Sequence, residues 1–167
     1  MRVAFVTPDL RRIDLVKSDA MCLCLHSEDW PLKGLPGLVD WRVFGHLSRL
    51  AQSGWITCKH GEVMLMPLDG RLPFERLFVI GMGSSTNGID RGRVATGLHG
   101  MFDALGKLRI HSAVLHLPGR PDGLPADVAM RIVLDVAARH QDHDEIVLVE
   151  PLEAQQAMKA VLAAHGP

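Results

Sequence analysis

Residues 78–88 are Phe78-Val79-Ile80-Gly81-Met82-Gly83-Ser84-Ser85-Thr86-Asn87-Gly88, an apolar run followed by a glycine-rich stretch. The apolar run has the length of a β-strand, and a helical pattern of apolar residues begins shortly after the glycines. This order of strand, glycine loop and helix is typical of α/β proteins. In such a loop, backbone N–H groups can approach a phosphate beside the N-terminus of the following helix.

The glycine loop allows two interpretations. As a phosphate-binding loop it lacks a following Lys-Ser or Lys-Thr pair, and Thr86 stands where a dinucleotide-binding fingerprint has its third glycine. As a plain strand-to-helix turn it needs glycine only for backbone angles that other residues avoid. The second interpretation is favoured, because short glycine motifs are weak signals. The loop residues that stay candidates for ligand binding are Gly81, Gly83, Ser84, Ser85, Asn87 and Gly88.

Outward from this loop, apolar runs alternate with helical spacings along the chain. The runs predict strands over residues 3–6, 13–16, 20–25, 62–67, 76–80, 110–117 and 145–149. The spacings predict helices over 38–53, from a cap at Asp90 to about 105, from Pro125 to about 140, and over 152–164. Strands so apolar on both faces belong in a sheet covered on both sides. We therefore expect one domain, residues 1–167, with a three-layer α/β/α sandwich and a mixed, mostly parallel central sheet.

Composition and charge narrow the class of protein. The chain has 167 residues, 47% hydrophobic and 22% charged, which excludes a disordered protein and a membrane-spanning one. Lys and Arg number 18 and Asp and Glu 19, so the net charge of −1 argues against a general nucleic-acid binder. The one local basic patch that the sequence suggests comprises Arg91, Arg93, Lys107 and Arg109. Three cysteines suit a reducing compartment, and we expect a cytoplasmic protein.

Aromatic residues are few. Tyrosine is absent, which makes a stacking platform for nucleic-acid bases unexpected. Trp30, Trp41 and Trp55 flank the helix predicted over residues 38–53, and we expect them to pack this helix against the sheet.

Two groups of residues suggest metal binding. Cys22, Cys24 and His26 alternate along one predicted strand and share a face, and Cys58 or His60 would complete a tetrahedral zinc site. The alternative is that these cysteines are core residues, and it is favoured because Cys-x-Cys lacks the usual zinc spacing.

The second group is the loop 140–145, where two histidines precede or alternate with acidic residues. A divalent ion is one interpretation of this loop, and a solvated turn after a helix is the favoured one. No nucleophile elbow and no His-Glu-x-x-His motif occurs in the chain. We expect no catalytic residue, no metal and no cofactor.

Four segments together resemble a known family. Ser18-Asp19-Ala20 precedes an apolar strand, and 45–50 reads Gly-His-Leu-Ser-Arg-Leu before Gly54. Residues 59–67 and 76–83 follow in the same order. In this order and spacing, the chain from about residue 2 to residue 118 resembles the N-terminal domain of the leucyl aminopeptidase (peptidase M17) family.

The resemblance implies a domain that lacks the family's chemistry. In that family, two metal ions are held in a separate C-terminal domain around an Asn-Thr-Asp-Ala-Glu-Gly-Arg motif, and this chain has no such motif. The N-terminal domain resembles a macro domain, an α/β/α fold that elsewhere binds ADP-ribose. By that likeness, Asp19 and the loop 81–88 are the positions expected to contact a nucleotide.

These observations lead to one expected function and two alternatives. We expect a non-catalytic binding or assembly module that contacts copies of itself, as a homo-oligomer, or a separate peptidase-type partner, with no membrane partner. The first alternative is a macro-like module that binds ADP-ribose or a related nucleotide through the loop 81–88. The second is a nucleic-acid role, which the net charge disfavours.

Overall fold

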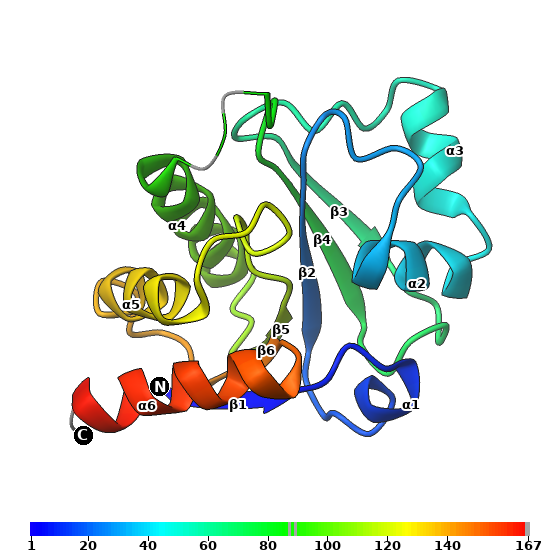
Figure 1. The fold of residues 1–167 in the computed structure, drawn as a ribbon. Helices are drawn as coiled ribbons and strands as arrows, with labels where there is room; N and C mark the ends of the chain where they lie inside the picture. The colour runs from blue at the N-terminus through cyan, green and yellow to red at the C-terminus, as the bar shows by residue number, and fades with distance from the viewer. Residues whose placement is uncertain (87, 89, 166–167) are drawn as a thin grey trace.

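The computed structural model describes residues 1–86, 88 and 90–165, and it contains a six-stranded sheet between two layers of helices (Figure 1). The strands lie in the order β1-β6-β5-β2-β4-β3, where β3 pairs antiparallel with β4 and the other four pairings are parallel. The predicted three-layer sandwich with a mixed, mostly parallel sheet is thus confirmed. The strand bounds are β1 (Arg2–Val6), β2 (Ala20–Leu25), β3 (Val63–Pro67), β4 (Arg76–Gly81), β5 (Ser112–Leu115) and β6 (Glu145–Val149).

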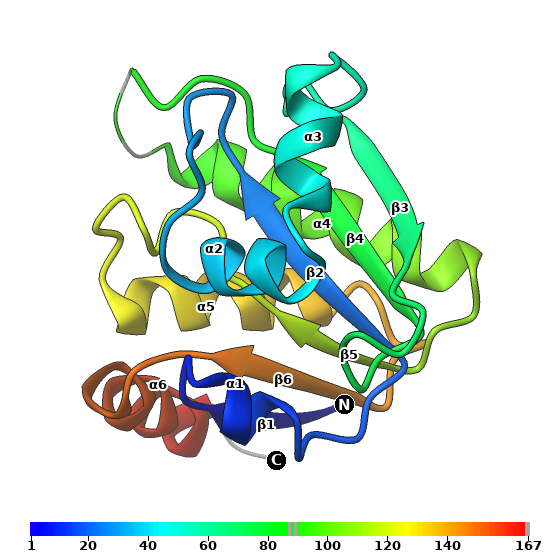
Figure 2. The same cartoon turned by 90° about the vertical axis from the view of Figure 1, so that its right-hand side faces the viewer.

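The helices divide between the two faces of the sheet, as Figure 2 shows. One face is covered by α4 (Arg91–Lys107), α5 (Ala126–Ala137) and α6 (Leu152–His165). The other face is covered by α1 (Leu10–Ile13), α2 (Gly34–Arg42) and α3 (His46–Gln52). Each layer has its own hydrophobic core, so neither face of the sheet is left to solvent.

Strand β2 lies in the interior of the sheet, between β5 and β4. All six of its residues are buried, because successive side chains point to opposite faces and both faces are covered. Ala20, Cys22 and Cys24 face the core under α4 and α5. Met21, Leu23 and Leu25 face the core under α2 and α3. The strand predicted over 20–25 is therefore correct in position and in its two-sided burial.

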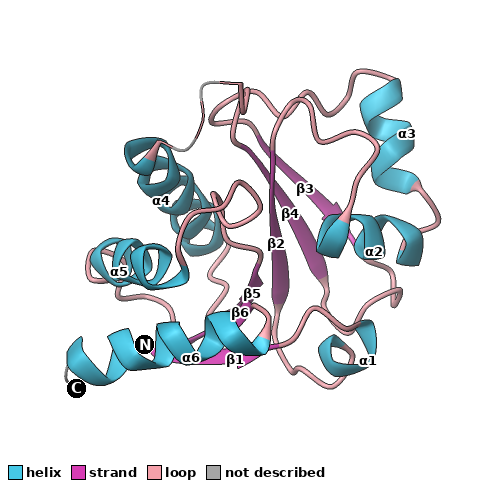
Figure 3. Ribbon diagram, viewed as in Figure 1, coloured by secondary structure: helices cyan, strands magenta, loops and turns pink. Residues whose placement is uncertain are grey.

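Helix α4 begins where the sequence predicts. The carboxylate of Asp90 accepts the N–H groups of Gly92 and Arg93, at 2.8 and 3.3 Å, and so caps the first turn. Helix α5 follows Pro125, as predicted, although it ends at Ala137 rather than near residue 140. Figure 3 shows how the strands and helices alternate along the second half of the chain.

The strand predicted over residues 13–16 is wrong. Ile13 is instead the last residue of α1, a single turn that Asp9 caps by accepting the N–H of Arg11 at 2.9 Å. This turn brings Ile13 fully into the core beneath α2, while Leu15 stays 76% exposed. The short-range capping bond therefore overrides the β-branched pattern that suggested a strand.

The single helix predicted over residues 38–53 is also wrong. The structure has two helices, α2 and α3, with a break at residues 43–45, where Gly45 has a left-handed φ of 70°. Across the break, the carboxylate of Asp40 in α2 accepts the N–H of Ser48 in α3 at 3.2 Å and the Ser48 hydroxyl at 2.5 Å. This side chain satisfies polar groups that a continuous helix would bond internally, and it stabilises the change of direction.

The three tryptophans do not share the predicted role. Trp30 is half-buried and packs against the core beneath α2. Trp41 and Trp55 are 70% and 78% exposed, so they do not hold a helix against the sheet. Phe44, beside Trp41 in the break between α2 and α3, is 65% exposed as well. The surface around α2 and α3 thus carries three largely exposed aromatic side chains.

Candidate functional site

The glycine loop follows the carboxyl end of β4. Gly81 donates its N–H to the carbonyl of Glu62, and Gly83 donates its own to the carbonyl of Cys58, at 2.7 and 2.8 Å. A Cβ at Gly81 would collide with the carbonyl of Lys59, and Gly83 has a φ of 74°. Both glycines are therefore required by the close approach of residues 58–62, as the turn interpretation predicts.

The rest of the loop is held by two charged side chains. Glu28, which follows β2, accepts the N–H of Ser85 at 3.1 Å, and Arg93 donates from Nη1 to the carbonyl of Ser84 at 2.7 Å. The hydroxyl of Ser84 and the N–H of Ser85 lower the pKa of the exposed Glu28 carboxyl. The amide at Ser85 thus already has a carboxylate partner within the chain. Gly88 has a φ of 75°, and Asn87 lies outside the described residues.

Asp19 lies at the opposite edge of the sheet from the glycine loop. It immediately precedes β2, whereas the loop follows β4, which runs parallel to β2. The length of β2 separates the two edges by roughly 20 Å. The Asp19 carboxylate accepts the N–H and the hydroxyl of Ser112, at 3.1 and 2.9 Å. The structure therefore does not bring Asp19 together with the loop 81–88.

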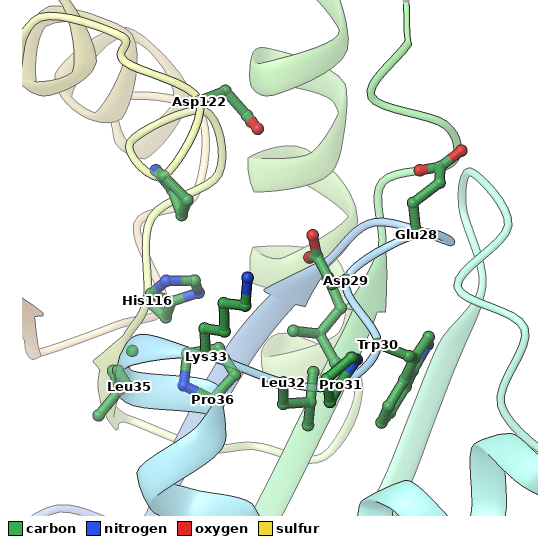
Figure 4. Close-up of a pocket in the computed structure, with 13 residues that line it drawn as sticks. Glu28, Asp29, Trp30, Pro31, Leu32, Lys33, Leu35, Pro36, His116 and Asp122 are labelled. Carbon is green, nitrogen blue, oxygen red and sulfur yellow. The ribbon is translucent and has the colours of Figure 1, made fainter.

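A crevice opens at the carboxyl ends of β2 and β5, as Figure 4 shows. The residues that line it come from 28–36, after β2, and from the segment after β5 that contains His116, Pro121 and Asp122. Its volume is about 420 Å³, within the range of small-molecule sites. These residues come from segments about 90 positions apart, and the pairing of β2 with β5 brings them together.

The crevice lies at a topological switch point. Strands β2 and β5 are adjacent and parallel. The chain leaves β2 for α2 on one face, but it leaves β5 for α5 on the other face (Figure 1). The two connections separate above the sheet and leave room between them. In open α/β sheets, ligands bind at such points, outside the carboxyl ends of the strands.

One buried histidine connects the three loops at this edge. His26 follows β2, and its Nδ1 lies 3.1 Å from the carbonyl oxygen of Gly83, after β4. Its Nε2 lies 2.9 Å from Oδ2 of Asp122, after β5. The atom that each ring nitrogen faces is a hydrogen-bond acceptor. The backbone N–H of His26 donates to the Asp29 carboxylate at 2.7 Å and so holds this side chain in place at the crevice.

His116 forms part of the crevice wall. Its Nδ1 is buried and has no hydrogen-bond partner among the residues that the structure describes. Burial lowers the pKa of His116 to about 4, against smaller opposing effects of the Cys24 backbone and Asp122. The ring is therefore neutral at neutral pH and presents an unsatisfied polar atom in a partly apolar wall.

The two suggested metal groups are dispersed by the fold. Cys22 and Cys24 face the core under α4, whereas Cys58 faces the opposite core. Burial raises the pKa of all three thiols, that of Cys58 to about 12, so they stay protonated. In the loop 140–145, the ring of His143 is buried and bonded to a backbone carbonyl. Among the described residues, no group of three or more His, Cys, Asp or Glu side chains is placed to hold a metal ion.

The suggested basic patch is also dispersed. Arg91 and Arg93 lie in the first turn of α4, and Lys107 is its last residue. Sixteen helical steps of about 1.5 Å separate the ends by roughly 24 Å. The Arg93 guanidinium is engaged with the glycine loop. The four basic residues therefore do not form one continuous surface.

Sequence reasoning missed most of the crevice. Trp30, Lys33 and His116 were not candidates, nor were Asp29 and Asp122. Residues 30–37 were recognisable only as a loop rich in proline and glycine. The sequence did contain one signal for the crevice, which is that its residues follow predicted apolar strands. Segments that follow parallel strands meet at one edge of the sheet.

Solved structures identify the class of this fold. The macrodomain of Oceanobacillus iheyensis with MES bound superposes with a TM-score of 0.75 at 12% identity, over 98% of this chain and 90% of that one. A Trypanosoma brucei macrodomain in complex with ADP-ribose gives 0.69 at 17% identity, over 99% and 69% of the two chains. At these identities the likeness shows the fold, which is macrodomain-like.

The family follows from the sequence. The profile of the cytosol aminopeptidase family, N-terminal domain, matches residues 28–140, and the chain therefore belongs to this family. The matched part is the N-terminal domain, which is not the catalytic one. A mutant of tomato leucine aminopeptidase superposes with a TM-score of 0.67 at 13% identity, over 97% of this chain but 35% of that one. The resemblance seen in the sequence is confirmed.

A search of the curated proteins found no significant match. Across residues 1–86, 88 and 90–165, every helix is too short or too polar to cross a membrane.

The depressed pKa of His116 predicts a loss of stability in mild acid. Below about pH 6.5, His116 takes up a proton in the unfolded chain but stays neutral in the native protein. The free energy of unfolding is therefore highest above pH 6.5 and decreases as the pH falls towards 4. The full loss is at most about 3 kcal/mol, because part of the ring reaches the crevice opening.

Urea unfolding at pH 7.5, 6.0 and 5.0 measures this loss. Burial also lowers the pKa of His140 and adds to the same trend. In His116→Phe, which keeps a ring but cannot titrate, the pH dependence should become shallower than in the unaltered chain. Equal slopes in both proteins would show that His116 does not titrate as described.

Proposed function

We propose that this chain is a non-catalytic binding module whose ligand site is the crevice between residues 28–36 and 116–122. The observation that carries the proposal is the position of the crevice at the β2–β5 switch point, where the two connections diverge. The match to the N-terminal domain of an aminopeptidase family supports a role in binding rather than in peptide hydrolysis.

An adenine nucleotide is the ligand class that the similar fold suggests, and it is tested beside amino acids. A Trypanosoma brucei protein of the same fold was solved in complex with ADP-ribose. In this chain the glycine loop adjoins the crevice through the contact between Ser85 and Glu28. ADP-ribose or a related nucleotide would lie in the crevice with a phosphate near Ser84 and Ser85, and it would displace Glu28.

Thermal unfolding with added ligands tests the proposed function. The probes are ADP-ribose, ADP and a mixture of the common L-amino acids, each at millimolar concentration. A ligand at 100 times its dissociation constant adds about 2.7 kcal/mol of stability, so binding should raise the midpoint by several degrees.

A blocking variant locates the binding. Pro121→Trp places a large ring at the exposed crevice wall, and Pro73→Trp does the same at the opposite edge of the sheet. The shift should vanish only in Pro121→Trp. No shift with any probe, or a shift that survives the blocked crevice, would overturn the proposed function.

A docking role is the second candidate function, and the exposed aromatics favour it. Trp41 and Phe44 adjoin a shallow hollow at the break between α2 and α3. The guanidinium of Arg71 lies 4.4 Å from the centre of the Phe44 ring and orients it. Exposed aromatic side chains of this kind are enriched at protein interfaces. A second copy of the chain is the first partner to test.

Sedimentation velocity over a hundredfold concentration range measures self-association. If this surface joins copies, the unaltered chain should show a concentration-dependent increase in mass, and Trp41→Ala should weaken it at least tenfold. Leu152→Ala, equally exposed on α6, is the matched control and should leave the association unchanged. A monomer at every concentration would rule out the homo-oligomer.

A further inference from the structure

The two sides of the crevice differ in charge. Figure 4 shows the carboxylates of Glu28, Asp29 and Asp122 in the upper part of the view, which we call the acidic side, above Lys33 and the start of α2. Glu28 accepts the N–H of Ser85, and Asp29 accepts the backbone N–H of His26. Asp122 contacts the His26 ring. The other oxygen of Asp29 and that of Asp122 accept no hydrogen bond from any described residue. These carboxylates are thus held in position while keeping acceptor capacity for a cation.

The other side offers hydrogen-bond donors. Helix α2 starts at Gly34, and its N-cap Lys33 makes no side-chain capping bond. No residue in the described part of the chain accepts the N–H of Gly34 or Leu35, and Lys33 forms no ion pair there. The partial positive charge of the helix N-terminus adds to the ammonium of Lys33. This side therefore suits an anion such as a carboxylate.

His116 supplies an independent sign of a missing partner. Its ring and Lys33 line the same crevice (Figure 4), and its buried Nδ1 has no hydrogen-bond partner in the described chain. Burying such a group without a partner is unfavourable. A polar ligand in the crevice can relieve this cost if the ring turns and brings Nδ1 to the opening.

Between the two sides the wall is apolar. Leu25 and Leu35 are buried at its base, and Trp30, Pro31 and Pro36 extend it to the surface. The wall can cover an aliphatic or aromatic side chain, and the volume of about 420 Å³ leaves room for one. A ligand that fills this crevice needs an ammonium, a carboxylate and an apolar group.

We propose that the crevice binds a zwitterionic α-amino acid with an apolar side chain. Its ammonium group lies against Asp29 and Asp122, its carboxylate against Lys33 and the N–H groups that open α2, and its side chain against Trp30 and its neighbours. This inference rests on the proposed function and names its ligand class.

The charge balance favours this class over the alternatives. Three carboxylates against one lysine repel a polyphosphate, since like charges brought together oppose binding. A simple amine leaves the donors of α2 unpaired, and a simple fatty acid leaves the carboxylates facing an apolar group. The zwitterion satisfies both sides at once.

Calorimetric titration of the full chain separates the two charges of the ligand. The probes are L-leucine, leucinamide, which lacks the carboxylate, 4-methylpentanoate, which lacks the ammonium, and ADP-ribose. Leucine should bind at least tenfold more tightly than each of the other three. Leucyl-leucine distinguishes a free amino acid from a peptide, and it should bind more weakly because its charges are further apart.

Two variants assign each charge to its partner. Lys33→Met should weaken leucine at least tenfold and leave leucinamide unchanged. Asp29→Asn, which keeps an acceptor for His26, should weaken leucine and leave 4-methylpentanoate unchanged. Lys17→Met and Asp69→Asn, both exposed and outside the crevice, are the matched controls and should bind leucine normally.

The outcomes separate this inference from the proposed function. Binding of ADP-ribose without leucine, or leucinamide bound as tightly as leucine, overturns the inference and leaves the binding crevice standing. Leucine binding that persists in Pro121→Trp, or no binding by any probe, overturns both. Loss of leucine binding in Lys33→Met and Asp29→Asn, with both controls unchanged, supports the assignment.

Discussion

The two-sided burial of β2 is the constraint on which the remaining structure depends. Because its six residues are apolar on both faces, helices must cover the sheet above and below it. Its own connection turns to α2 on one face, and that of its neighbour β5 turns to α5 on the other. The crevice is a consequence of this divergence. A polar residue in the middle of β2 would place an unpaired polar group in one of the two cores and destabilise the fold.

The edge of the sheet above β2 is more polar than the sheet itself, and its loops are tied together. His26 contacts loops that follow β4 and β5, and Glu28 contacts the glycine loop. These contacts give the crevice defined walls in the absence of a ligand, which lowers the ordering cost of binding. They also explain why the glycine loop, although adjacent to the crevice, does not itself line it.

The sequence was sufficient where a single local pattern decides the structure. Apolar runs located the strands at 20–25 and 76–80, and Asp90 located the start of α4. It was insufficient where a side chain acts over a few residues, as Asp9 does on α1 and Asp40 does on Ser48. Exposed aromatics such as Trp41 were misplaced because an apolar residue is not always a buried one.

The candidate site shows the same limit more clearly. The glycine loop was recognisable because its residues are contiguous, whereas the crevice joins Lys33 to His116 through the order of strands, which the sequence does not display. Asp19 was grouped with the loop by likeness to a family. Asp19 precedes β2, whereas the glycine loop follows β4, and these two strands are parallel. A residue before one parallel strand and a residue after another lie at opposite edges of the sheet, so the sequence already separated them.

Amide hydrogen exchange of the full chain, with and without saturating L-leucine, tests the central claim most directly. The account predicts slower exchange in residues 26–36 and 116–125, the two segments that bound the crevice, and little change elsewhere. Unchanged exchange in both segments, or protection centred on residues 12–19 and 110–112 at the opposite edge of the sheet, would contradict it.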